Sequence, residues 1–291
     1  MASLAHRCEY WIIKLAVGFA KSLSSSLADK LGIGLGRVTY YMWGRRRRIA
    51  LENLRHAFGS QKSESELRDI ARSVFENIGR TLVEFARFSR IGVEGAKSIL
   101  VSPGDAAIRD AFSRGKGGVF ITAHYGNWEL LGMYPSIHGH AVDFVVGTQH
   151  NPLVDEMFID FRRSMGVGII PLKTALKGVF KALKQNHLVG LVADQHDPGK
   201  DLIIDFFGRP SSWPKGPAVF AIRSGAPIVP CLLTRERFDR HVIIAGDPIY
   251  HVGGDEGAAI RTMTEQYVRF FEKHIRAHPE QWMWTHRRWK M

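Results

Sequence analysis

An apolar run of strand length, Gly118-Val119-Phe120-Ile121-Thr122-Ala123, is followed directly by the hexapeptide His124-Tyr125-Gly126-Asn127-Trp128-Glu129. The run predicts a buried strand. Gly126 permits a turn, and Asn127 can cap a short helix that starts at Trp128. We expect this turn to bring the imidazole of His124 against the carboxylate of Glu129. A histidine oriented by a carboxylate is the minimal arrangement for taking a proton from a hydroxyl group. The structural alternative is a histidine that only caps the strand.

Strand-length apolar runs and amphipathic stretches alternate over the rest of the chain. The runs lie at 141–147, 167–171, 188–193, 227–234 and 241–245, and the amphipathic stretches at 152–166, 173–186 and 215–225. This alternation predicts an α/β fold with a mainly parallel sheet flanked by helices. A last helix is expected from about Glu256 to His278, before Pro279. Sites in such sheets lie beyond the carboxyl ends of strands, which is where the pattern places His124 and Asp194.

The first 95 residues or so have a wholly helical pattern. We predict a membrane-associating amphipathic region over 1–40 and a single α/β domain over 41–291, helical at 41–100 and sheet-containing at 105–291. The apolar N-terminal positions are interrupted by Lys14, Lys21 and Lys30, so the unbroken stretch is far shorter than the ~20 residues that span a bilayer. This pattern suits a helix lying in the membrane interface. A helix packed on the protein's own core is the alternative.

Charge and composition narrow the classes of partner and chemistry. The 291 residues carry a formal net charge of +12, which favours acidic partners. Residues 1–56 hold ten Lys or Arg against three acidic residues, with Arg45-Arg46-Arg47-Arg48 beside aromatic residues. The two cysteines, Cys8 and Cys231, give no disulfide framework or metal-ligand spacing. The sequence has no G-x-S-x-G elbow, no P-loop and no H-E-x-x-H pair, so we expect no cofactor and no catalytic metal.

Two further segments carry groups that could act on a substrate. Arg162 and Arg163 follow His150-Asn151-Pro152-Leu153-Val154-Asp155 on a predicted helix, and either guanidinium could bind a phosphate or an acyl carbonyl. Solvent-facing arginines are the alternative. The segment from Val192 to Gly199 contains Asp194 and Gln195; Asp194 could hold Arg162 or a substrate hydroxyl, or could only form a turn.

A third segment is the C-terminal run Gln281-Trp282-Met283-Trp284-Thr285-His286-Arg287-Arg288-Trp289-Lys290. Its tryptophans and basic groups suit either a phospholipid interface or cation–π packing inside the fold, and both interpretations stay open.

In their order along nearly the whole chain, these segments resemble the bacterial lipid A biosynthesis acyltransferases of the lauroyl/myristoyl type. That family lies within the lysophospholipid-type acyltransferases, which share an H-x4-D/E motif. The resemblance rests on the following segments: Arg45 to Leu54, His124 to Glu129, Asn151-Pro152-Leu153 with Arg162, Ala193-Asp194-Gln195, Phe206-Phe207-Gly208 and Trp282 to Arg288.

The resemblance implies a glycerolipid-acyltransferase-like fold and transfer of a fatty acyl chain from acyl carrier protein to a hydroxyl of a lipid A precursor. His124 would be the base and Glu129 would orient it. Arg162, held by Asp194, would stabilise the oxyanion. Asn127, Gln195 and Arg163 are further candidates for substrate binding.

The implied partners are acyl carrier protein, an anionic glycolipid acceptor and the membrane surface, without nucleic acid. The implied location is the cytoplasmic face of the bacterial inner membrane. A lysophospholipid or a phosphatidylinositol mannoside is the alternative acceptor. A basic binding module without catalysis is the alternative outside enzymes.

Overall fold

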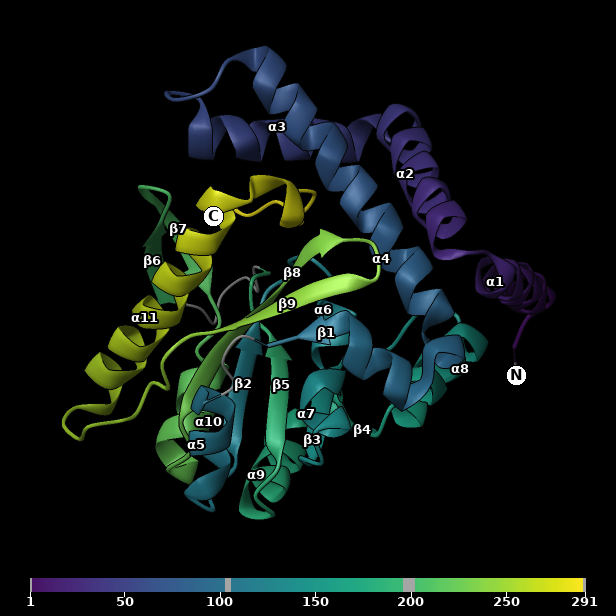
Figure 1. Ribbon diagram of the computed structural model, residues 1–291. Coiled ribbons are helices and arrows are strands. Elements are labelled where there is room, and N and C mark those ends of the chain that lie inside the picture. The colour runs from purple at the N-terminus through teal and green to yellow at the C-terminus, as the bar shows by residue number, and fades with distance from the viewer. Residues whose placement is uncertain (1, 103–105, 196–201, 290–291) are drawn as a thin grey trace.

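The computed structural model describes residues 2–102, 106–195 and 202–289 (Figure 1). Within these residues the central sheet has seven strands in the order β1-β9-β8-β2-β5-β3-β4. Its strands are β1 (Leu100–Val101), β2 (Gly118–Thr122), β3 (Val142–Val146), β4 (Val167–Pro171), β5 (Leu188–Val192), β8 (Ile228–Arg237) and β9 (Arg240–Ala245). Strands β8 and β9 pair antiparallel, and the other neighbours pair parallel. The predicted α/β fold with a mainly parallel sheet is confirmed.

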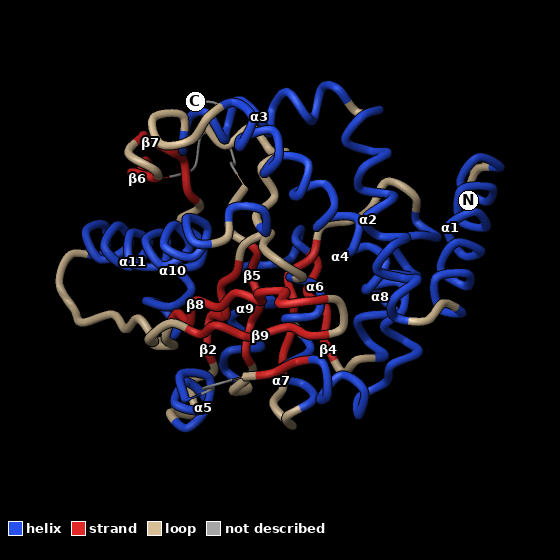
Figure 2. The backbone as a smooth tube through the Cα atoms, turned by 45° about the horizontal axis from the view of Figure 1, so that its top comes forward, coloured by secondary structure: helices blue, strands red, loops and turns tan. Residues whose placement is uncertain are grey.

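Helices cover both faces of this sheet (Figures 1 and 2). The predicted amphipathic stretches form α8 (Pro152–Ser164), α9 (Ala175–Lys184), α10 (Gly216–Ser224) and α11 (Glu256–Ala277), and the short helix after the hexapeptide is α6 (Trp128–Leu131). Further elements were not predicted: α5 (Ala106–Ser113), α7 (Met133–Ile137), the hairpin β6 (Leu202–Phe206) and β7 (Arg209–Trp213), and the 3-10 turns Leu172–Thr174 and Pro279–Gln281. The fully buried β2 lies between two apolar cores, one on each face of the sheet.

The N-terminal third is helical, as predicted, and consists of α1 (Leu4–Ser22), α2 (Ser25–Met42), α3 (Gly44–Phe58) and α4 (Glu64–Ile99). The Ser24 side chain caps α2, so the apolar N-terminal segment forms two helices. The predicted boundary at residue 40 falls inside α2. Helix α2 packs closely along α4: a Cβ added to Gly36 would lie 2.3 Å from the carbonyl oxygen of Phe75. This close approach requires glycine.

Helix α1 lies beside α8 at the edge of the fold (Figures 1 and 2). The Asn151 side-chain amide donates to the carbonyl oxygen of His6 at 2.8 Å and to Glu9 at 2.9 Å. Among the residues described, none of the helices combines the length and apolar character needed to cross a membrane.

The C-terminal run packs inside the fold, which decides between its two interpretations. Trp282 and Trp284 are buried, and the guanidinium of Arg288 lies 4.0 Å from the centre of the buried Trp213 ring. Lys290 lies outside the described residues.

Candidate active site

His124 and Asp194 meet because their strands are neighbours in register. Parallel pairing sets Thr122 of β2 opposite Val192 of β5, and the N–H of Ala193 donates to the carbonyl oxygen of Thr122 at 3.0 Å. The segment after each strand then continues to the second residue beyond it, which is His124 after β2 and Asp194 after β5. Their side chains therefore emerge side by side at the carboxyl end of the sheet, where sites in this architecture lie.

The Asp194 carboxylate holds His124 at two points. Its Oδ1 lies 2.7 Å from the imidazole Nδ1, and its Oδ2 accepts the backbone N–H of His124 at 2.9 Å. The same Oδ2 accepts the indole N–H of Trp282 at 2.7 Å. Both the position and the ring orientation of His124 are therefore fixed.

The two groups shift each other's titration in opposite directions. Burial alone would raise the pKa of Asp194, but the charge and hydrogen bonds of His124 outweigh it and lower that pKa. Burial alone would lower the pKa of His124, but the charge and hydrogen bond of Asp194 outweigh it and raise that pKa above its usual value. An ionised carboxylate only accepts, so Nδ1 carries the proton and Nε2 is left as the basic nitrogen.

The His124 ring is accessible, whereas its partner is not. The His124 side chain is 19% exposed and that of Asp194 is 4% exposed. Gln195 Nε2 lies 3.4 Å from both ring nitrogens, and the Trp128 ring packs edge-on at 5.0 Å between centres. A substrate hydroxyl can therefore approach the imidazole while Asp194 stays sealed from water.

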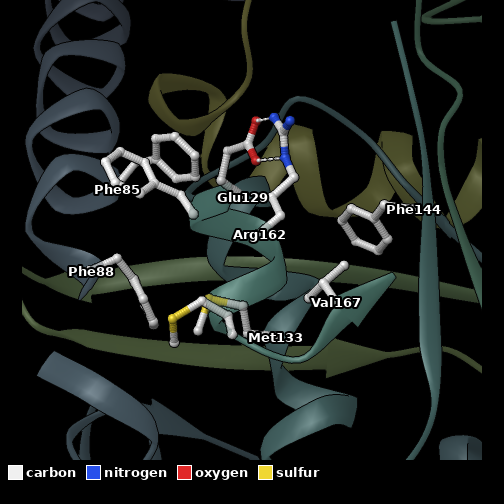
Figure 3. Close-up of a pocket in the computed structure, with 9 residues that line it drawn as sticks. Phe85, Phe88, Glu129, Met133, Phe144, Arg162 and Val167 are labelled. Carbon is white, nitrogen blue, oxygen red and sulfur yellow. Dashed lines mark hydrogen bonds and ion pairs between the residues drawn. The ribbon is translucent and has the colours of Figure 1, made fainter. Parts of the chain in front are cut away.

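Glu129 has a different partner from the one expected. Its carboxylate forms two bonds with Arg162 of α8, Nη2 to Oε1 at 2.8 Å and Nε to Oε2 at 3.1 Å (Figure 3). The predicted contacts of Glu129 with His124 and of Asp194 with Arg162 are therefore wrong. Glu129 lies in the first turn of α6, so its side chain leaves the strand end and meets α8. Its charge makes a lesser contribution to raising the pKa of His124 than Asp194 does.

The Glu129–Arg162 pair closes a narrow apolar pocket, the inner pocket. Figure 3 shows the pair at one end and apolar side chains around the rest. Those side chains are Phe85, Phe88, Met133, Phe144, Phe161, Met165 and Val167. The volume is about 10 Å³, room for roughly one water molecule. Any chain entering here must displace these side chains.

The turn between His124 and Glu129 is built around Gly126. Its φ is +54°, and a Cβ there would lie 1.7 Å from the carbonyl oxygen of Leu233, so no other residue fits. The C-terminal run pins the turn: Gly126 N–H donates to the carbonyl oxygen of Gln281 at 2.8 Å, and Met283 N–H donates to that of His124 at 2.9 Å. The Thr81 hydroxyl of α4 donates to the carbonyl oxygen of Gly126 at 2.9 Å.

A buried charged cluster contacts this turn through the side chain of Asn127. Asn127 accepts the N–H of Leu130 at 3.2 Å and donates to Glu84 at 2.7 Å. Arg235 of β8 binds both oxygens of Glu84, at 3.0 and 2.5 Å, and His241 of β9 lies 3.2 Å away. Burial raises the pKa of Glu84, but the charges of Arg235 and His241 outweigh it and lower that pKa. Sequence reasoning missed this cluster.

The other predicted substrate-binding residues differ in how close the structure places them to His124. Asn127 is fully buried with both side-chain groups engaged, so in this conformation it positions the turn and does not reach a substrate. The Arg163 side chain is 64% exposed and pairs with Asp160 of the same helix at 3.8 Å. Gln195 lies beside His124. The segment from His196 to Gly199 lies outside the described residues.

A second cleft, of about 310 Å³, opens on the Gln195 side of His124. Trp43 and Arg46 form one wall, and Thr285 and His286 form another. Arg46 donates to the carbonyl oxygen of Thr285 at 3.0 Å. This mixed polar and aromatic lining can accept the polar part of a substrate.

Comparison with known proteins assigns the chain to a family. The model of the family described as bacterial lipid A biosynthesis acyltransferase matches residues 3–291. The lipid A biosynthesis lauroyltransferase of Escherichia coli is 27% identical over 300 residues, covering 97% of this chain and 92% of that protein. The phosphatidylinositol mannoside acyltransferase of Mycobacterium tuberculosis is 29% identical over 186 residues, 62% of this chain and 56% of that protein. This chain therefore spans little more than half the length of the mycobacterial relative. The chain belongs to the bacterial lipid A biosynthesis acyltransferase family.

Proposed function

We propose that this acyltransferase moves a fatty acyl chain from an acyl-carrier-protein thioester to a hydroxyl group of a lipid A precursor. The observation that carries the proposal is the His124–Asp194 pair, which leaves Nε2 as the basic nitrogen of a partly exposed imidazole at the carboxyl end of the sheet. The near full-length similarity to the Escherichia coli lauroyltransferase supports the choice of acceptor.

In the proposed reaction His124 Nε2 takes the proton of the acceptor hydroxyl, and Asp194 stabilises the resulting imidazolium. The hydroxyl oxygen attacks the thioester carbonyl carbon, and the negative charge moves to the carbonyl oxygen. Arg162, held in place by Glu129, is the proposed stabiliser of that oxyanion. The carbon–sulfur bond then breaks, and the thiolate takes the proton from Nε2. The ester forms, and the histidine is neutral again.

These roles differ from those that we expected from the sequence. Asp194, not Glu129, orients the imidazole. Glu129 orients Arg162 and adds a second negative charge near the imidazolium. Both carboxylates are therefore expected to matter, but for different steps of the reaction.

We propose that the enzyme works on the cytoplasmic face of the bacterial inner membrane. The net charge of +12 would attract the acidic carrier protein and a phosphorylated lipid. Apolar side chains of α1 and α2 are exposed, among them Trp11, Leu15 and Val38. Such a face suits contact with the bilayer interface.

A phosphatidylinositol mannoside is the second candidate acceptor, because the mycobacterial relative aligns at 29% identity. Both acceptors are anionic glycolipids that offer a sugar hydroxyl. The proposed chemistry at His124 is the same for either.

The test is an assay with the purified full chain, acyl carrier proteins charged with chains of several lengths, and a defined lipid A precursor or phosphatidylinositol mannoside. Mass spectrometry reads the product. We expect an increase of one acyl group on the lipid A precursor, and no increase with His124→Ala. The matched control is His138→Ala, since His138 is an exposed histidine that bonds the backbone of α7. Near-normal turnover by folded His124→Ala would refute the proposed base.

A further inference from the structure

An apolar groove of about 350 Å³ lies between α1, α2, α4 and α8, outside the candidate active site. We call it the outer groove. Every described side chain that lines it is hydrocarbon, including Ala16 and Phe19 of α1, Leu35 of α2, Leu82 of α4, and Phe158 and Phe161 of α8. Its volume falls in the range of ligand pockets, roughly 300–1,000 Å³. These described side chains offer no polar group that could fix a headgroup, so they suit an aliphatic chain.

The outer groove adjoins the candidate active site. Phe85 and Phe161 line both the outer groove and the inner pocket beneath Glu129 and Arg162. Their rings are 5.7 Å apart in an edge-to-face contact, and the Arg162 guanidinium lies 5.8 Å from the Phe85 ring. An alkyl chain in the outer groove would therefore be separated from Arg162 only by the ring of Phe85.

The surface around the groove is apolar with a basic edge. Phe19, Leu35 and Leu82 line the groove and are also 58%, 45% and 60% exposed. The Lys21 ammonium lies 5.3 Å from the Phe161 ring at the side of this face. Exposed apolar surface with a cationic edge matches a bilayer that contains anionic headgroups.

We propose that the outer groove takes an alkyl chain of the acceptor lipid, drawn partly out of the bilayer. This inference rests on the proposed function and extends it to how the acceptor is held. The groove opens on the face that would meet the membrane, and its inner end lies beside Phe85 and Arg162. A chain seated there brings its headgroup to the site from the membrane side. The acyl chain of the donor begins at the thioester, in the reaction centre. It would therefore meet the inner pocket first, and the outer groove lies beyond Phe85 and Phe161.

The test uses the full chain with phosphatidylglycerol vesicles containing a fraction of phosphatidylglycerol that carries a diazirine in one acyl chain. After irradiation, peptide mass spectrometry maps the adducts. We expect adducts on the groove-lining residues Val83 and Phe158, which are less exposed than Trp11 and Met42. Ala16→Trp places an indole in the groove, and we expect about tenfold fewer adducts. A tenfold loss of binding corresponds to the free energy of burying fewer than two methylene groups of the alkyl chain. Ala5→Trp is the matched control, because Ala5 is exposed on the same helix and does not line the groove.

Two outcomes would decide against the inference. Adducts confined to outward residues such as Trp11 and Met42 would show that this face only rests on the bilayer. Groove adducts obtained solely from a diazirine acyl chain delivered on acyl carrier protein would assign the groove to the donor. Leu82→Asn, which adds no volume, should also reduce groove labelling and guards against misfolding of Ala16→Trp. Labelling needs no turnover, so His124→Ala should label like the native chain. A labelled groove in an inactive enzyme would refute the proposed function alone.

Discussion

Replacing Asp194 by Asn changes the proton position on His124 with almost no change in shape. Oδ2 of Asp194 accepts two N–H groups, from the His124 backbone and the Trp282 indole, whereas Oδ1 faces His124 Nδ1. The new amide should place its oxygen where it can accept both N–H groups. Its NH₂ group then donates to Nδ1, which moves the ring proton to Nε2 and removes the basic nitrogen.

The expected loss follows from that change of tautomer. General-base catalysis contributes about 10²–10⁴ in rate, and an Asp-to-Asn change behind a catalytic histidine costs about 10⁴ in a serine protease. We therefore expect kcat to fall by about 10³–10⁴, equivalent to about 4–5.5 kcal/mol in activation free energy.

The pH dependence of kcat/KM gives a second, independent test of the role of Asp194. Catalysis needs the neutral imidazole, so kcat/KM of the native enzyme should rise with pH through the pKa of His124. Asp194 raises that pKa above its usual value. Asp194→Asn removes the negative charge, so the acid limb of the residual activity should move to lower pH.

The assay is steady-state acyl transfer to the lipid A precursor, followed by mass across a pH series. Trp282→Phe is the matched control: it removes one donor to Oδ2 but leaves the Nδ1 contact, and a loss below tenfold is expected. Activity of Asp194→Asn within tenfold of native, with an unmoved acid limb, would show that Asp194 does not set the tautomer.

Three further changes test other parts of the account. Arg162→Lys keeps the charge but not the two-pronged contact with Glu129, so kcat should fall about 10–10²-fold; an unchanged kcat in the same assay would remove Arg162 from the oxyanion site. Glu84→Gln leaves the buried charge of Arg235 without its carboxylate partner, so the free energy of unfolding in urea should fall by about 3–5 kcal/mol at pH 7. Burial raises the pKa of Glu84, but the charges of Arg235 and His241 outweigh it and lower that pKa. The contribution of Glu84 is therefore present above the unfolded pKa near 4.5 and is lost as pH falls; a deficit that grows toward acid pH would contradict this. Gly36→Val places a methyl-bearing carbon against α4 and should cost about 1–3 kcal/mol in urea unfolding, whereas Gly34→Val, at an open position, should cost less.

The sheet was predictable because its strands are short apolar runs separated by amphipathic stretches. The β6–β7 hairpin was not, since its turn residues are Phe207 and Gly208, both with positive φ. Asn-Gly or Asp-Gly is the recognisable signal for such a turn, and phenylalanine rarely adopts that conformation. Its two strands therefore had no turn signal between them.

The contacts within the candidate site were harder to predict from the sequence than the strands were. His124 and Asp194 were both placed at strand ends, but their contact depends on β2 and β5 being neighbours, and strand order is not written in local periodicity. Glu129 was favoured because it lies five residues away, although chain proximity does not decide where its side chain points. Glu84 gave one usable signal, a carboxylate among the apolar residues of the predicted helix, which implies a buried partner.

The proposed mechanism requires that Asp194 holds the proton on Nδ1 of His124 and leaves Nε2 basic. Nitrogen NMR of the ring in protein labelled with ¹⁵N-histidine, titrated with pH and assigned by comparison with His124→Ala, measures this directly. We predict a neutral Nδ1–H tautomer, a pKa of His124 above its usual value of about 6.5, and conversion to Nε2–H in Asp194→Asn. A native His124 with its proton on Nε2, or a pKa that Asp194→Asn leaves unchanged, would contradict it.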